Sequence, residues 1–138
     1  MSTETVAISF PGGKLVDARI GRFTIRTDQA ESAGGYGSAP EPFDLFLASI
    51  GSCAGIFAWN FCQARGLSTQ GMALRMHCER DPVRKRFTRI TLELELPAGF
   101  PERYRDAIAR AMELCSVKRH ILEAPEFRIE LSPQGVSG

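Results

Sequence analysis

The feature that most constrains the fold of this chain is an apolar stretch over residues 43–65. Pro42 precedes it and Gly66 follows it, which matches the residue preferences of a helix start and of a left-handed helix end. Because the stretch is apolar nearly all round, we expect a long helix buried at the centre of the fold. Its middle, residues 48–55, is crowded with small residues and holds two glycines, each of which costs a helix about 1 kcal/mol relative to alanine. We expect close approach of another element to offset this cost.

Segments of alternating apolar and polar residues precede this helix and predict strands. They lie at residues 6–10, 15–20 and 22–27. A loop over residues 29–42, rich in Gly, Ser, Ala and Pro, then leads into the helix. A loop of this length in a small domain is often functional.

The chain after residue 66 predicts a hairpin, a second helix and a last strand. The hairpin strands carry the alternating sets Met72, Leu74, Met76, Cys78 and Ile90, Leu92, Leu94, Leu96. The second helix begins at Pro101 and presents on one face Tyr104, Ala107/Ile108, Ala111/Met112 and Cys115. The last strand alternates through Phe127, Ile129 and Leu131, and we expect the tail from Ser132 to Gly138 to fray. This order predicts a single α+β domain over residues 1–138, with an antiparallel sheet and its helices on one side.

Composition indicates a soluble globular protein, with 43% hydrophobic and 24% charged residues. A net charge of +1 gives no reason to expect nucleic acid or a membrane as a partner. The first ten residues lack the features of a signal peptide, and we read no stretch as approaching the roughly 18 apolar residues of a membrane helix. Four cysteines without a secretion signal favour a reducing compartment, so we expect the cytoplasm.

Cys53 and Cys115 are the candidate reactive thiols, because the helices that carry them would approach each other if both packed on one sheet. A reactive thiol needs a lowered pKa and some access, and the cations at residues 118–120 could supply positive potential. The alternative for any of the thiols is a small buried hydrophobic residue, and we assign Cys62 and Cys78 to it. A metal site is not expected, because the chain has no close cysteine pair and only two histidines.

Three short sequence motifs, two of which contain the candidate cysteines, are informative together. Residues 34–40 (GGYGSAP) form a glycine-rich loop that leads to a proline, residues 42–53 (PFDLFLASIGSC) end in a cysteine, and residues 115–122 (CSVKRHIL) begin with one. Together they resemble the OsmC/Ohr family of osmotically induced and organic hydroperoxide resistance proteins. The family's motifs are such a loop, P-x-E-L-L-L-A-x-L-G-S-C, and a second C-P/S/T-V segment. The predicted order of elements also matches, so the resemblance covers nearly the whole chain.

The resemblance implies an OsmC-like fold: antiparallel sheets, two long central helices and an intertwined homodimer with active sites at the subunit interface. It also implies a thiol peroxidase in which Cys53 attacks a hydroperoxide and becomes a sulfenic acid. Cys115 then resolves it as a disulfide, and an external dithiol reduces the disulfide. No metal, flavin or other cofactor takes part.

The chain departs from the peroxidase members at two positions. They carry a glutamate ten residues before the first cysteine, where this chain has Phe43, and its nearest carboxylate is Asp44. They also carry an arginine from an early strand, for which Arg19, Arg22 and Arg26 are the candidates here. This pattern resembles the OsmC-like branch of the family.

Two functions from different classes fit the sequence. The first is a cysteine-based peroxide reductase in oxidative-stress defence, which we favour. The second is a binding protein for an apolar small molecule, in which the thiols are incidental. Four aromatic side chains could line its pocket, although they could equally be core residues: Phe43, Phe46, Phe57 and Trp59.

Overall fold

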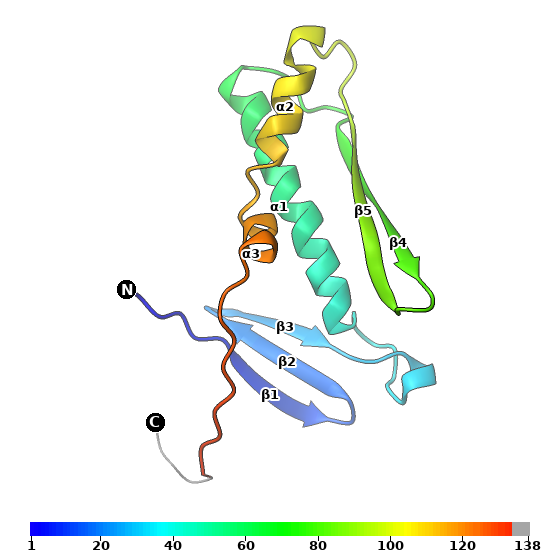
Figure 1. Ribbon diagram of the computed structural model, residues 1–138, viewed down its shortest axis with the longest axis vertical. Coiled ribbons are helices and arrows are strands. Elements are labelled where there is room, and N and C mark those ends of the chain that lie inside the picture. Colours follow the sequence, from blue (N-terminus) through cyan, green and yellow to red (C-terminus); the bar gives the residue numbers. More distant parts are fainter. Residues whose placement is uncertain (134–138) are drawn as a thin grey trace. The chain divides into compact units, whose positions relative to one another are not determined.

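The computed structural model describes residues 1–133 of the chain (Figure 1). Three strands come first, then a long helix, a two-stranded hairpin and two short helices, which confirms the predicted mixture of helices and antiparallel strands. The chain divides into two compact units, residues 1–52 and residues 53–138. The boundary between them falls inside helix α1 (Pro42–Ala64).

The first unit contains a three-stranded antiparallel sheet in the order β1-β2-β3. Its strands are β1 (Ala7–Gly12), β2 (Leu15–Ile20) and β3 (Phe23–Thr27). The turn at Gly21 has a φ of 57°, a left-handed conformation that glycine adopts without a steric penalty. All three predicted strands of this region are therefore confirmed.

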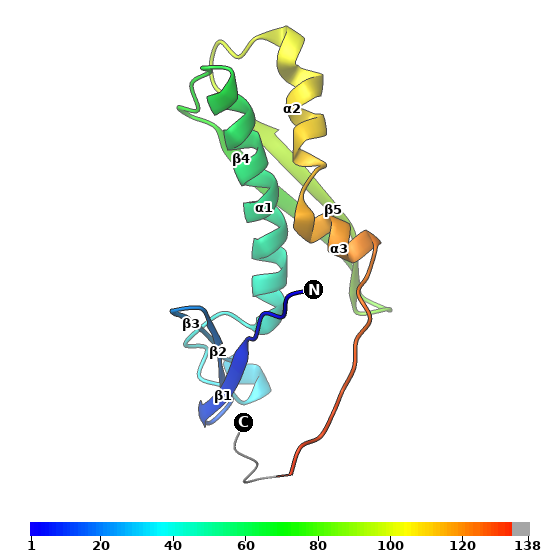
Figure 2. The same ribbon diagram turned by 90° about the vertical axis from the view of Figure 1, so that its left-hand side faces the viewer.

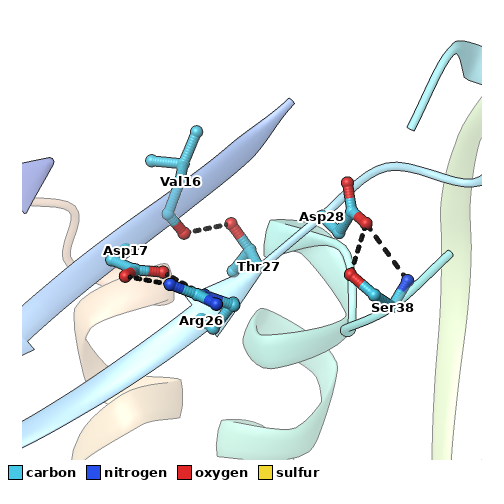
Figure 3. Close-up of polar contacts among 6 residues, drawn as sticks. All are labelled: Val16, Asp17, Arg26, Thr27, Asp28 and Ser38. Carbon is cyan, nitrogen blue, oxygen red and sulfur yellow. Dashed lines mark hydrogen bonds and ion pairs between the residues drawn. The ribbon is translucent and has the colours of Figure 1, made fainter. Parts of the chain in front are cut away.

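The loop after β3 closes around the carboxylate of Asp28, which is fully buried. That carboxylate accepts hydrogen bonds from the backbone N–H groups of Gln29, Tyr36 and Ser38 and from the Ser38 hydroxyl, at 2.6–3.1 Å. Figure 3 shows the two hydrogen bonds from Ser38. Desolvation opposes the charge, but the Ser38 hydroxyl, the strongest influence, and the backbone donors lower the pKa of Asp28 to about 2. A single charged side chain thus holds the two ends of the glycine-rich loop together.

Helix α1 begins and ends as the sequence predicts. It starts at Pro42, and Gly66 lies beyond its last turn with a φ of 64°. The N–H of Leu67 donates to the carbonyl of Cys62 at 2.9 Å, which satisfies one of the last carbonyls of the helix.

Two predictions about this helix are wrong for the single chain. It is not wholly buried, because Ile56 and Trp59 are 49% and 45% exposed to solvent. It is also long and apolar enough to cross a membrane, with a mean hydropathy of 1.6, although we read no such stretch from the sequence. The core helix of a soluble protein meets the same criterion, so this feature alone does not assign the chain to a membrane.

The second unit contains the antiparallel hairpin of β4 (Ala73–Asp81) and β5 (Arg86–Glu95). Its apolar positions face one another across the ladder, as the alternation predicts: the pairs include Leu74↔Leu94, Met76↔Leu92 and Cys78↔Ile90. At the turn, the carboxylate of Asp81 accepts hydrogen bonds from the N–H groups of Val83 and Arg84.

The second predicted helix is broken into three pieces. These are a 3-10 turn (Glu102–Tyr104), α2 (Arg105–Met112) and α3 (Ser116–Leu122), and both views show α2 and α3 as separate helices (Figures 1 and 2). Cys115 is not the end of a long helical face but the residue that caps α3, with φ −54° and ψ 124°. Its Sγ accepts a hydrogen bond from the backbone N–H of Lys118, with an N–S distance of 3.5 Å, which satisfies a backbone donor at the start of α3.

Ile108 of α2 packs in the core cluster of this unit together with the α1 residues Ala58, Phe61 and Cys62. This contact packs α2 against the C-terminal part of α1, which belongs to the second unit.

The predicted last strand is absent from the part of the chain that the structure describes. Phe127, Ile129 and Leu131 lie in an extended segment without strand pairing and are 85%, 93% and 95% exposed. Alternation favours an extended backbone, but a strand also needs a partner for its hydrogen bonds, and no segment within residues 1–133 pairs with this one. Most of the tail that we expect to fray, residues 134–138, lies outside the described residues.

Candidate functional site

The second unit brings Cys53 and Cys115 together. Cys53 projects from α1 and is half-buried, whereas Cys115, at the start of α3, is only 2% exposed. The Cys115 thiol lies within hydrogen-bonding reach of the Cys53 sulfur, and neither cysteine forms a disulfide. The Ser116 hydroxyl lies on the same side, with its Oγ 3.8 Å from the Cys53 Sγ.

Cys53 is the more acidic thiol of the pair. Desolvation raises its pKa, but hydrogen bonds from the Cys115 thiol, from the backbone of Val117 and from Ser116 outweigh this effect and lower the pKa below its ordinary value. The groups that lower it most are neutral donors. Because the thiolate is the nucleophilic form of cysteine, this environment favours reactivity at Cys53.

Cys115 has the opposite character. Desolvation and the hydrogen bond to Cys53 raise its pKa, although the backbone N–H groups of Lys118 and Val117 act against them. The site therefore pairs a half-buried thiol whose pKa is lowered with a buried thiol whose pKa is raised. Such a pair can form a sulfenic acid on the first sulfur and condense it with the second.

The other two cysteines lie apart from this pair. Cys62 is fully buried in the core, where desolvation raises its pKa despite the nearby Arg65, so its assignment as a buried hydrophobic residue is confirmed. Cys78 lies on β4 opposite Ile90 and is only half-buried, so the same assignment holds in part.

Two of the three basic residues at positions 118–120 have local partners. The Lys118 ammonium forms an ion pair with the Glu113 carboxylate, so its charge is compensated. The Nδ1 of His120 lies 2.6 Å from the Ser116 carbonyl oxygen. Ser116 itself was not singled out from the sequence, and the only signal for it is its position directly after Cys115.

The predicted supporting residues belong to the first unit. The Asp44 carboxylate accepts a hydrogen bond from the backbone N–H of Glu41, with an N–O distance of 2.9 Å, and so caps the start of α1. Arg26 forms a two-pronged ion pair with Asp17 across β2 and β3, with both N–O distances 2.9 Å (Figure 3). That hydrogen bonding lowers the pKa of Asp17 and raises the pKa of Arg26.

Of the remaining candidates, the Arg22 guanidinium lies 5.1 Å from the centre of the Phe23 ring, and Arg19 is exposed on β2. A role for any of these four residues beside Cys53 stays a prediction. Within residues 1–133, no group of three or more His, Cys, Asp or Glu side chains is arranged to hold a metal ion.

The chain matches the family model of OsmC-like proteins over residues 35–130. No curated protein is significantly similar to it in sequence. Among solved structures, it is similar to a candidate osmotic-stress-induced and detoxification response protein from Psychrobacter arcticus. The TM-score is 0.73 at 16% identity, with 86% of this chain and 88% of that chain covered.

Two other solved structures similar to this chain are organic hydroperoxide resistance proteins by name. An organic hydroperoxide resistance protein OsmC from Legionella pneumophila aligns with a TM-score of 0.56 at 21% identity, covering 88% of this chain and 91% of that one. A candidate organic hydroperoxide resistance protein from Vibrio cholerae has captopril bound in one of its active sites. It aligns with a TM-score of 0.60 at 17% identity, covering 88% of this chain and 87% of that one. At these identities the likeness establishes the fold.

Proposed function

The chain belongs to the OsmC-like protein family, and from this premise we propose that it is a cysteine-based peroxidase that reduces organic or hydrogen peroxides in oxidative-stress defence. Cys53 is the attacking thiol, Cys115 is the resolving thiol, and an external dithiol is the reductant. The names of the Legionella and Vibrio proteins support this substrate class.

The observation that carries the proposal is that two thiols close in space have pKa values shifted in opposite directions. Cys53 is partly accessible and has a lowered pKa, while Cys115 is buried and has a raised pKa. A nucleophile must be ionised and within reach of its substrate, whereas a resolving thiol must be close to it but need not be ionised beforehand.

The reaction follows from this arrangement. The Cys53 thiolate attacks one oxygen of the hydroperoxide, the O–O bond breaks, and an alcohol leaves after taking up a proton, so that Cys53 becomes a sulfenic acid. The Cys115 sulfur then attacks the Cys53 sulfur, the S–O bond breaks, and the Cys115 proton leaves with the hydroxide as water. The external dithiol reduces the resulting disulfide by exchange and restores both thiols.

The functional form is a homodimer located in the cytoplasm. Two apolar surfaces support the dimer, namely the exposed side of α1, with Ile56 and Trp59, and the segment with Phe127, Ile129 and Leu131. A single chain that left both in water would carry an aggregation liability, which a second copy would remove. An obligate interface of this kind buries about 2,000 Å² or more.

Binding of an apolar small molecule is the second candidate function. Phe43, Phe46 and Trp59 of α1 all remain partly exposed, and the first two rings are 5.2 Å apart. The captopril in an active site of the Vibrio protein supports an OsmC-like site that accepts a small organic molecule. This candidate predicts saturable binding without hydroperoxide turnover.

Hydroperoxide consumption with a dithiol reductant separates the two candidates. We expect steady turnover by the wild type, none by Cys53→Ser, and a single turnover by Cys115→Ser. Cys78→Ser is the matched control, because it removes a half-buried thiol outside the pair and should turn over like the wild type. A wild type that consumes peroxide no faster than the dithiol alone would refute the peroxidase and leave the binding candidate.

A further inference from the structure

Ser116 places a hydroxyl group against the thiol that the proposed reaction uses. Its Oγ is 3.8 Å from the Cys53 Sγ, within hydrogen-bond range for sulfur. The residue is the first of α3 and directly follows Cys115, which caps that helix. Its side chain is exposed, so the hydroxyl is not needed for core packing.

Two of the charged groups near Ser116 are engaged with other partners. Lys118 is paired with Glu113, and the His120 Nδ1 lies against the Ser116 carbonyl oxygen. What faces Cys53 from residues 115–117 is a thiol, a hydroxyl and backbone N–H groups. These are neutral donors, and a hydrogen bond from a neutral donor to an ionised acceptor is stronger than one between two neutral groups.

We propose that the Ser116 hydroxyl donates a hydrogen bond to the Cys53 thiolate. Ser116 is thus a positioning and activating residue for Cys53. The inference rests on the proposed function in taking Cys53 as the reacting thiol.

The test follows the alkylation of Cys53 by iodoacetamide in the reduced, full-length protein, with the modified residue identified by peptide mass spectrometry. Rates across pH give the apparent pKa, because the thiolate is the reacting form. Ser116→Ala should raise this pKa by about 0.5 to 1, which slows alkylation near neutral pH by roughly 3- to 10-fold. Ser116→Thr keeps the hydroxyl and should stay near the wild type, as should Ser68→Ala, which removes an exposed serine hydroxyl in the loop before β4.

Two results would overturn the inference: an unchanged pKa in Ser116→Ala, or a Ser116→Thr variant that behaves like the alanine variant. Circular dichroism of each variant checks that α3 remains folded. Alkylation requires no peroxide, so the outcome stands apart from the proposed function. A protein that shows the predicted pKa pattern but consumes no hydroperoxide would refute the peroxidase and retain this role of Ser116.

Discussion

Replacing Gly35 with alanine tests how tightly the loop around Asp28 is closed. A Cβ atom at position 35 would lie 2.1 Å from the Gln29 carbonyl oxygen and 2.7 Å from a carboxylate oxygen of Asp28. Real Cβ contacts are essentially never shorter than 3.0 Å, so the first gap must open by about 0.9 Å, from 2.1 to 3.0 Å. The Gln29 carbonyl is held in place by the N–H of Gly37 at 3.0 Å. Overpacking together with one lost hydrogen bond should therefore cost about 2 to 4 kcal/mol of unfolding free energy.

Thermal unfolding at a fixed protein concentration measures this cost. For a chain of this length about 1 kcal/mol corresponds to 3–5 °C, so Tm should fall by roughly 6 to 20 °C. Gly55→Ala is the matched control, because its Cβ would meet only the Leu74 side chain at 3.9 Å, within an ordinary contact distance. That variant lies inside α1 and should be stabilised by up to about 1 kcal/mol. A Gly35→Ala protein that melts within about 2 °C of the wild type would refute the packing argument.

Three further predictions follow from burial and ionisation. Because the pKa of Asp28 falls from 3.8 to about 2 on folding, its contribution to stability should be complete above about pH 4 and lost as the pH falls toward 2. Urea midpoints across this range should show the loss, and Asp28→Asn should abolish this part of the pH dependence. Ile108→Ala should lower the free energy of unfolding by about 2 to 4 kcal/mol in urea titrations, and a loss below about 1 kcal/mol would contradict its place in the core. In the folded protein at neutral pH, iodoacetamide should modify Cys53 before Cys115 and leave Cys62 unmodified; peptide mapping that finds Cys115 first would reverse the assigned roles.

The elements that were predicted correctly carry their signals in their own residues. Pro42 and Gly66 mark the ends of α1 by local backbone preference, and alternation alone identifies the β4–β5 hairpin. Both depend on neighbouring residues in the sequence, so no knowledge of the tertiary fold was needed.

The errors arise where the outcome depends on distant contacts or on an unusual cap. The positions from Tyr104 to Cys115 fit one helical face, but the chain turns at residues 113–115 and Cys115 caps α3. Cysteine is not among the preferred capping residues, so no residue there marks a helix start. The segment from Phe127 to Leu131 has strand alternation, but alternation does not reveal whether a pairing edge exists.

The candidate site was predicted only in part. From the sequence we named both thiols as candidates and, through family resemblance, their pairing, but not the groups that raise or lower the pKa of each one. The contrast between Cys53 and Cys115 depends on which backbone and hydroxyl groups reach each sulfur, and those groups include Ser116. Asp28 was missed for a similar reason, because nothing in its neighbourhood marks an aspartate that will be buried with four donors.

The central claim is that Cys53 and Cys115 form one redox pair, and a single-turnover reaction tests it most directly. The reduced protein is mixed with one equivalent of an organic hydroperoxide, quenched with an alkylating agent and mapped by mass spectrometry, with Cys62 and Cys78 as internal controls. The account predicts one Cys53–Cys115 disulfide for each hydroperoxide consumed, and in Cys115→Ser a sulfenic acid on Cys53 that dimedone traps. Oxidation that leaves Cys53 reduced, or a disulfide that joins Cys53 to any other cysteine, would contradict it.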